Sequence, residues 1–355
     1  MLQTPFFDPE KSYIENFEQG PFGAFTDGKV LQAAGEPQYR VLGQQVSLPF
    51  GIPAGPLLNG KYVKAALDKG FNIPVYKTVR TRQYASAPWP NVLSVQIADK
   101  DLTFAVAEQG LVANHRFTEP IAITNSFGVP SFEPDFWQED MAQASRAAKK
   151  GQFVIGSFQG TTNPHGDVEA YIQDFVLAAR LVKETGVKVL EANLSCPNEG
   201  TAHLLCYDIQ RSKTIISAIK NEIGDTQLVI KIGYFADIEQ FKRFVSEVGD
   251  MVQGISAINT VPAKIVDEHG QQALPGVGRL RSGVCGHPIK WAGLDMVQKL
   301  FSLKQELALA FTIIGVGGVT ISDDYQAYRA AGADIVMSAT GAMWNPYLAQ
   351  EICAS

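Results

Sequence analysis

Short apolar runs rich in Val and Ile recur from residue 51 onward and alternate with stretches whose apolar residues follow a helical period. Eight such runs are present, at 51–54, 73–79, 153–158, 187–193, 227–232, 254–259, 311–316 and 334–339. Strands that alternate with helices form parallel sheets, and eight such units can close into a barrel. The pattern therefore predicts an α/β fold, a (β/α)8 TIM barrel, with an open doubly wound sheet as the lesser alternative.

Two of the intervening helices are expected at 167–185 and 208–223, the second with Asp208 as its N-cap. The first 45 or so residues show no sustained period, and residues 260–287 resemble a Gly- and Pro-rich loop. Residues 80–133 contain strand-like pieces at 92–97 and 102–106. We expect an N-terminal extension (1–48) packed on a barrel domain (49–355), with the long loops inserted at the C-terminal face of the barrel.

The composition fits a large globular protein better than a nucleic-acid or membrane protein. The 355 residues are 46% hydrophobic and carry a net charge of −6 without any basic run. Four scattered cysteines include no C-x-x-C pair, which suits a reducing compartment. The opening segment has neither a signal-peptide core nor an apolar run of about 20 residues. We expect a cytoplasmic protein without nucleic-acid, membrane or metal partners.

Polar residues follow the predicted strands at their carboxyl ends, where a barrel builds its active site. Lys77 and Lys231 interrupt apolar strands. Such a lysine either extends its amine toward solvent or faces a bound anion, and we favour the anion. Asparagines are expected at the same end of the barrel: Asn125, Asn193, Asn198 and Asn259. One asparagine is usually a turn-former, but four together match a ligand edge that alternates carbonyl and N–H groups, such as a pyrimidine.

Glycine-containing turns follow the last two predicted strands, at 315–324 and 337–344. Backbone amides in such turns, and the positive end of a helix expected to begin near Ser322, suit a phosphate group. Phosphate sites after the last two strands recur in barrels. We therefore expect the phosphate of a ligand at this edge.

Cys196 lies in the polar turn "NLSCPN", directly after a predicted strand. Cysteine is more often a small buried hydrophobe. A thiol, with a reference pKa of about 8.5, ionises nearer neutral pH than any hydroxyl group does. We therefore expect a chemical role for Cys196 instead of a packing role.

The motifs that carry this chemistry occur in one order: "IPAG", "YKTVRTR", "ITNSFGVPS", "LEANLSCPN", "VIKIGYF", "INTV", "SGVCGHPIK", "IIGVGGV" and "SATGA". Between about Pro49 and Ala342 the chain resembles the dihydroorotate dehydrogenases, FMN-dependent barrels of de novo pyrimidine biosynthesis, and most closely their soluble class. The resemblance implies oxidation of (S)-dihydroorotate to orotate. Cys196 would remove the C5 proton, and hydride would pass from C6 to flavin N5.

The resemblance also assigns roles to matching residues. It implies FMN binding by Ala54, Lys77, Thr78, Asn193, Lys231, Ile258, Gly286, Gly317, Gly318, Ala339 and Thr340. It implies substrate binding by Lys77, Asn125, Ser126, Phe127, Gly128, Asn193, Asn198, Asn259 and Thr260. A soluble electron acceptor, such as fumarate or a partner flavoprotein, and a homodimer are expected as well.

Two departures from the family pattern stand out. Ala54 occupies a position where the soluble class usually has serine, and "SGVCG" replaces Gly-Gly-x-Ser-Gly, so Ser282 and Cys285 are the unusual members. Three other functions stay open at this point. They are a flavin barrel acting on another dihydropyrimidine, a flavin-free lyase with a Schiff base on Lys231, and a non-catalytic ligand-binding protein.

Overall fold

The computed structural model describes residues 2–31, 35–97, 101–162, 167–195 and 204–355. Eight parallel strands form a closed barrel in chain order: β3 (Phe50–Ile52), β4 (Ile73–Val79), β8 (Ile155–Phe158), β9 (Val189–Asn193), β10 (Gln227–Ile232), β11 (Gly254–Ala257), β14 (Thr312–Val316) and β15 (Ile335–Met337). Pairing of β15 with β3 closes the sheet. The predicted (β/α)8 barrel is confirmed, and each of the eight predicted runs overlaps one of these strands.

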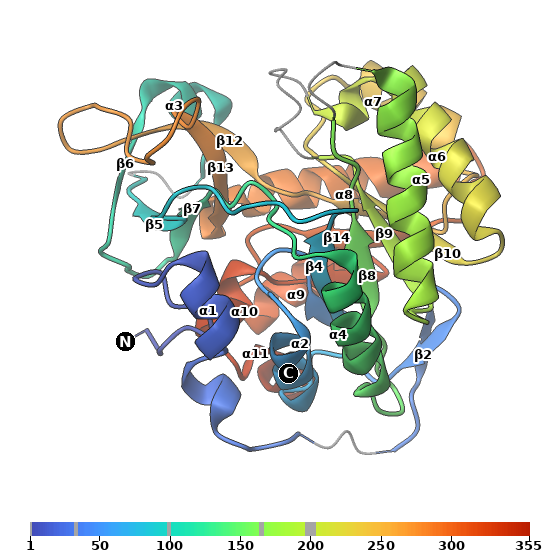
Figure 1. Ribbon diagram of the computed structural model, residues 1–355, viewed down its shortest axis with the longest axis horizontal. Helices are drawn as coiled ribbons and strands as arrows, with labels where there is room; N and C mark the ends of the chain where they lie inside the picture. The colour runs from blue at the N-terminus through green and yellow to red at the C-terminus, as the bar shows by residue number, and fades with distance from the viewer. Residues whose placement is uncertain (1, 32–34, 98–100, 163–166, 196–203) are drawn as a thin grey trace.

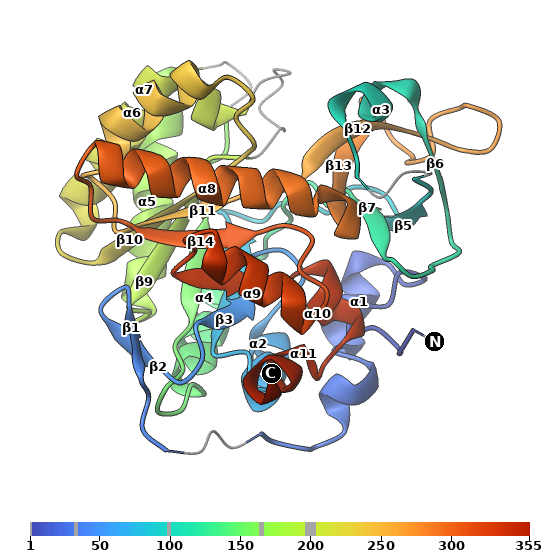
Figure 2. The same ribbon diagram turned by 180° about the vertical axis from the view of Figure 1, so that it is seen from behind.

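Helices surround the barrel (Figures 1 and 2): α2 (Gly60–Asp68), α4 (Pro134–Arg146), α5 (Val168–Glu184), α6 (Ile209–Ile223), α7 (Ile238–Val248), α8 (Lys290–Glu306), α9 (Ser322–Ala330), α10 (Thr340–Trp344) and α11 (Leu348–Ala354). The helix predicted at 208–223 is α6. The Asp208 side chain accepts a hydrogen bond from the Arg211 backbone N–H at 3.0 Å, which confirms the predicted N-cap.

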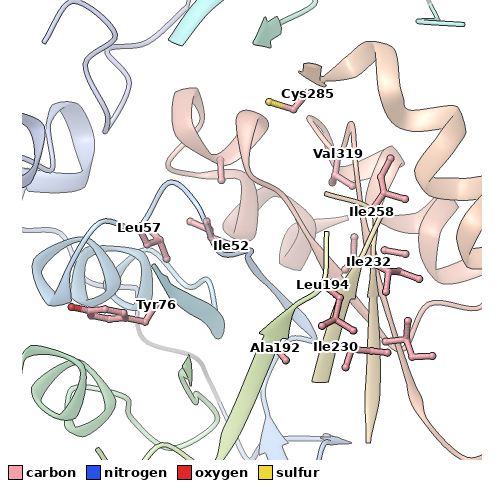
Figure 3. Packing of buried hydrophobic residues seen from close by; sticks show 14 of the residues in the cluster. Ile52, Leu57, Tyr76, Ala192, Leu194, Ile230, Ile232, Ile258, Cys285 and Val319 are labelled. Atoms are coloured by element: carbon pink, nitrogen blue, oxygen red, sulfur yellow. The ribbon is translucent and has the colours of Figure 1, made fainter. Parts of the chain in front are cut away.

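Alternation of side chains along the strands separates the barrel interior from the layer under the helices. The outward residues Ala192, Leu194, Ile230 and Ile232 lie together in that outer layer (Figure 3). Inward residues form a second apolar cluster that includes Val75, Ile155, Val189, Val229, Ile314 and Met337. Two positions further along β4 and β10 come Lys77 and Lys231, so the same alternation directs both lysines into the carboxyl end of the barrel interior.

The opening residues, predicted to be irregular, contain regular elements: α1 (Tyr13–Gln19), the 3-10 turn η1 (Gly23–Thr26), and the antiparallel pair β1 (Tyr39–Val41) and β2 (Gln44–Val46). Leu42 and Val46 pack into the interior cluster of the barrel. Phe6 and Phe7 are buried, and the Phe6 N–H donates to the Met343 carbonyl oxygen at 3.0 Å. These short elements are stabilised by packing on the barrel, which their local pattern does not show.

The two long interruptions form one second sheet, which we call the insertion sheet. Its strands are β5 (Val92–Val95), β6 (Leu111–Asn114), β7 (Ala122–Asn125), β12 (Val261–Val266) and β13 (Arg281–Gly286), closed in the order β12-β13-β7-β5-β6. Figures 1 and 2 show these strands side by side, with α3 (Phe104–Gln109) against them.

Two predictions for these interruptions are wrong. Residues 260–287 are not a loop throughout, because they include β12 and β13, and residues 102–106 run into helix α3 instead of a strand. The β13 strand pairs with β7, which is far away in the sequence. A pattern read along the chain contains no information about such long-range pairing.

Candidate active site

A cavity lies between the carboxyl ends of the barrel strands and the insertion sheet. Most of the predicted site residues line it: Ala54, Lys77, Thr78, Asn125, Ser126, Phe127, Gly128, Asn193, Lys231, Asn259, Thr260, Ala339 and Thr340. Ile258, Gly286 and Gly317 are not lining residues, but each directly adjoins one in the sequence, and Gly318 follows two residues after the lining residue Val316. Cys196 and Asn198 lie outside the described residues.

The described lining residues give the cavity a positive character. Three of its side chains are cationic, those of Lys77, Lys231 and Arg281, and no described lining residue is Asp or Glu. Glu108 neutralises part of the Arg281 charge in a two-bond ion pair at 2.6 Å. The two lysines are almost fully buried, so water screens their charge poorly. Such a cavity favours anionic ligands.

Lys231 enters the cavity from β10 and faces a buried carboxyl group. Its Nζ donates to the Ala54 carbonyl oxygen at 3.3 Å. Burial lowers the pKa of Lys231, and the negative charge of Glu191 on β9 opposes that shift. Burial correspondingly raises the pKa of Glu191, and the Lys231 charge opposes the rise. The two side chains are therefore electrostatic partners inside the barrel.

A short polar chain connects Glu191 to the cavity wall. Ser157 Oγ donates to Glu191 Oε1 at 2.9 Å and lies 3.0 Å from Thr78 Oγ1. The register of β4 against β8 shifts between Tyr76 and Val79. Because such an irregularity turns successive side chains toward one side, both Lys77 and Thr78 reach the cavity. Glu191 Oε2 has no hydrogen-bond partner among the described residues.

Ser195 holds two of the predicted asparagines together. Its hydroxyl group donates to Asn193 Oδ1 at 2.9 Å and accepts from Asn259 Nδ2 at 3.1 Å. The Ser195 backbone N–H also donates to Asn193 Oδ1, at 3.2 Å. Ser195 was missed by sequence reasoning although it lies within the "NLSCPN" motif, because a buried linking serine has no spacing signature of its own.

Asn125, at the end of β7, is held by β13. Its Nδ2 donates to Cys285 Sγ at 3.2 Å, and Ser282 Oγ donates to the Asn125 carbonyl oxygen at 3.0 Å. Burial raises the pKa of the Cys285 thiol, whereas hydrogen bonds from Thr340 and Asn125 and the charge of Lys231 oppose that rise. The unusual residues of "SGVCG" thus orient an asparagine of the cavity.

The glycine turn after β14 is tightly packed. Gly318 has a φ of 70°, and a Cβ atom there would come within 2.6 Å of Lys290 atoms. Asp324 Oδ2 accepts from the backbone N–H groups of Thr320 and Ile321 at 2.8 and 3.2 Å. These two backbone N–H groups before α9 therefore already have a hydrogen-bond acceptor and are not available to a ligand. A ligand anion at this edge would be bound by the preceding turn and by the segment that begins α10.

Two further lining residues had no signal in the sequence pattern. Phe7 comes from the N-terminal segment, and Arg281 comes from a stretch predicted to be a loop. Both reach the cavity through tertiary packing alone.

Comparison with known proteins agrees with this geometry. A family model described as dihydroorotate dehydrogenase matches residues 108–355. A curated dihydroorotate dehydrogenase of Dictyostelium discoideum is 34% identical over 363 aligned positions, which cover 99% of this chain and 97% of that protein. The chain belongs to the dihydroorotate dehydrogenase family. It is accordingly an enzyme, an oxidoreductase of that family.

More distant dihydroorotate dehydrogenases differ in the electron acceptor that their names state. The catalytic subunit of an NAD(+)-dependent enzyme of Desulforamulus reducens is 28% identical, covering 66% of this chain and 71% of that protein. A quinone-dependent enzyme of Thermobifida fusca is 26% identical, covering 87% of this chain and 76% of that protein.

A solved structure shares the fold. The dihydroorotate dehydrogenase of Eimeria tenella in complex with ferulenol superimposes with a TM-score of 0.70 at 17% identity, covering 91% of this chain and 84% of that chain. None of the helices in the described part of the chain is long and apolar enough to span a membrane.

Proposed function

We propose that this chain oxidises (S)-dihydroorotate to orotate in de novo pyrimidine biosynthesis, with FMN as its cofactor. One observation carries the proposal: cationic and carboxamide side chains converge on one cavity whose described lining includes no Asp or Glu. The FMN phosphate and the orotate carboxylate are anions. The edge of a pyrimidine ring alternates carbonyl and N–H groups, which a carboxamide can match.

The residues around the cavity fit FMN. Lys231 supplies a buried positive charge, which suits a ring that becomes more negative when it is reduced. Gly55 lines the cavity, and a Cβ atom there would meet no atom within 4 Å, so the backbone is open to a ligand. FMN, when bound, supplies the acceptor for the hydride that the substrate loses. The proposed FMN residues are Ala54, Lys77, Thr78, Asn193, Lys231, Ile258, Gly286, Gly317, Gly318, Ala339 and Thr340.

The asparagines would orient the pyrimidine ring. Asn125 and Asn259 approach the cavity from the insertion sheet and from the segment after β11, whereas Asn193 ends β9. Ser195 and Cys285 fix three of these amides before any ligand binds, so little side-chain entropy is lost on binding. The remaining proposed substrate residues are Lys77, Ser126, Phe127, Gly128, Asn198 and Thr260.

We propose Cys196 as the base that removes the C5 proton. It directly follows Ser195, which is anchored to Asn193 and Asn259 at the edge of the cavity. Cys285, which lines the cavity, is a poorer candidate. Its thiol is buried, burial raises its pKa, and it accepts a hydrogen bond from Asn125. A general base must be able to take up a proton near neutral pH.

The proposal also names partners that follow from the family resemblance. We propose a soluble electron acceptor, fumarate or a partner flavoprotein, and a cytoplasmic homodimer. Adding fumarate, NAD(+) and a soluble quinone analogue one at a time to the reduced enzyme would distinguish the acceptors. Light scattering of the purified protein would determine its oligomeric state.

Anaerobic titration of the purified protein tests the proposed function. We expect a yellow protein whose flavin absorbance is bleached by dihydroorotate and much less by dihydrouracil. Preferential bleaching by dihydrouracil would favour another dihydropyrimidine as substrate. A colourless protein that becomes covalently linked to a carbonyl substrate when borohydride reduces a Schiff base would favour the lyase. A buried lysine with a lowered pKa, such as Lys231, also suits that chemistry. Bound flavin that neither compound reduces would favour a non-catalytic protein.

A further inference from the structure

We propose that Arg279 is a positioning residue that makes Ser126 a hydrogen-bond donor to the negatively charged substituent of the substrate. The inference rests on the proposed function, and it concerns a residue in the segment between β12 and β13. That segment projects from the insertion sheet in Figures 1 and 2. Near its end, Arg279 contacts Ser126, which lines the cavity.

The guanidinium group of Arg279 is buried, with 9% of the residue exposed. Its Nε donates to Ser126 Oγ at 3.1 Å, and its Nη2 donates to the Ser126 carbonyl oxygen at 2.9 Å. The carbonyl oxygens of Pro88, Pro90 and Pro275 accept its other hydrogen bonds. One side chain thereby joins the β12–β13 segment to the loop before β5 and to the end of β7.

The positive charge of Arg279 has no carboxylate partner among the residues that the structure describes. The hydrogen-bond partners found for it are four backbone carbonyl oxygens and one hydroxyl group. Burial lowers the pKa of Arg279, but an arginine in a protein stays protonated. A full positive charge is therefore hydrogen-bonded to Ser126, which lines the cavity.

The direction of the hydrogen bond to Ser126 decides what the serine can do. Arginine only donates, so Ser126 Oγ must accept from Arg279 Nε. The hydroxyl proton of Ser126 has no acceptor within the described part of the chain. Because Ser126 lines the cavity, this proton is available to a ligand. A hydroxyl polarised by a cation donates more strongly to a carboxylate.

A purely structural role for this contact is less well supported. The Ser126 backbone is already held by Asn91, whose carbonyl oxygen accepts from the Ser126 N–H at 2.8 Å. Asn91 Nδ2 also donates to the Ser126 carbonyl oxygen at 3.1 Å. The bond from Arg279 Nε to the hydroxyl oxygen is thus additional to the bonds that fix the chain.

The test compares two ligands on the FMN-loaded enzyme: orotate, which carries a carboxylate, and methyl orotate, which is the uncharged ester. Binding is followed by the perturbation of the flavin spectrum. We expect Arg279→Met to weaken orotate binding about tenfold or more, the usual effect of losing a charge-assisted hydrogen bond. Methyl orotate affinity should change less than about twofold, and FMN content should be unchanged. Arg243→Met, at an exposed position on α7, is the matched control.

Two further variants keep the proposal falsifiable if Arg279→Met folds poorly. Ser126→Ala should lose orotate affinity selectively in the same way. Arg279→Lys keeps the charge without the forked donor geometry and should lose less than Arg279→Met. Equal losses for orotate and its ester, or no loss for either, would overturn the role of Arg279. A wild-type enzyme that fails to bind orotate would instead overturn the proposed function.

Discussion

The hydroxyl group of Ser195 accepts a hydrogen bond from the side-chain amide of Asn259 at 3.1 Å. The same hydroxyl group donates to Asn193 Oδ1 at 2.9 Å, so one buried oxygen joins the end of β9 to the segment that follows β11. A hydroxyl group can serve both asparagines at once because it donates one hydrogen bond and accepts others. The two asparagines therefore hold their orientation through a residue that does not line the cavity.

Replacing Ser195 by alanine should weaken orotate binding. Asn193 Oδ1 keeps the Ser195 backbone N–H as a donor, whereas Asn259 Nδ2 loses its hydroxyl acceptor. A buried polar group that loses its partner costs about 1–3 kcal/mol, equivalent to about tenfold or more in affinity. Titration of the flavin spectrum with orotate measures the effect. Ser302→Ala, at an exposed position on α8, is the matched control. Unchanged orotate affinity in Ser195→Ala would show that the serine does not maintain the site.

Asn125→Ala and Asn259→Ala should each weaken orotate binding without loss of FMN. Each substitution removes one partner of the pyrimidine edge, an effect of about 1–3 kcal/mol. Isothermal titration with orotate, together with the flavin content of the purified variants, tests this expectation. The exposed residue Asn221 on α6 provides the control variant Asn221→Ala. Orotate affinities equal to that of the wild type would contradict substrate binding by these two asparagines and would indicate that they only stabilise turns.

The barrel is predictable from the sequence because its signal is local. Each strand is a short apolar run, and alternation within that run places Lys231 two residues after Val229 on the same face. The carboxyl ends of all eight strands meet at one end of the barrel. Polar residues at those ends, Lys77 and Asn193 among them, can therefore be assigned to one site from the sequence alone.

The insertion sheet is not predictable in the same way. Strand β13 pairs with β7 and with β12, and β12 pairs with β6, so two distant segments complete each other. Cys285 and Arg279 are brought to the cavity by that pairing. Ser157 and Glu191 are also not predictable as site residues. They are hydrogen-bonded to each other beneath the cavity, and no characteristic spacing in the sequence indicates such a pair.

Lys231→Met should destabilise the protein and lower its FMN content. The substitution removes the positive charge that offsets the buried carboxyl group of Glu191, and breaking a buried charge pair usually costs about 3–5 kcal/mol. The double variant Lys231→Met/Glu191→Gln should recover most of the stability but not the FMN binding. Urea denaturation and the flavin content of the purified proteins measure the two effects. Equal stability of the single and double variants would contradict the electrostatic pairing.

The stability contributed by Cys206 should fall as the pH rises. Burial raises the pKa of its thiol from 9.0 to about 12, so the folded state holds this proton more tightly than the unfolded state. The contribution is complete below pH 9 and is lost by up to about 1.4 kcal/mol per pH unit above it. The destabilisation caused by Cys206→Ala, measured with urea, should therefore be smaller at pH 10 than at pH 8. An equal difference at both pH values would contradict this account.

The substitution Cys196→Ala tests whether Cys196 takes the C5 proton of dihydroorotate. The measurement is the anaerobic rate of flavin reduction by dihydroorotate in a stopped-flow instrument, for the wild type and the variant at equal FMN loading. We expect the variant to bind orotate normally and to be reduced about 10²–10⁴-fold more slowly at neutral pH, the range that general base catalysis supplies. Cys196→Ser should be nearly as slow at neutral pH and should recover partly as the pH rises. A Cys196→Ala enzyme reduced at the wild-type rate would contradict the assignment of Cys196 as the base.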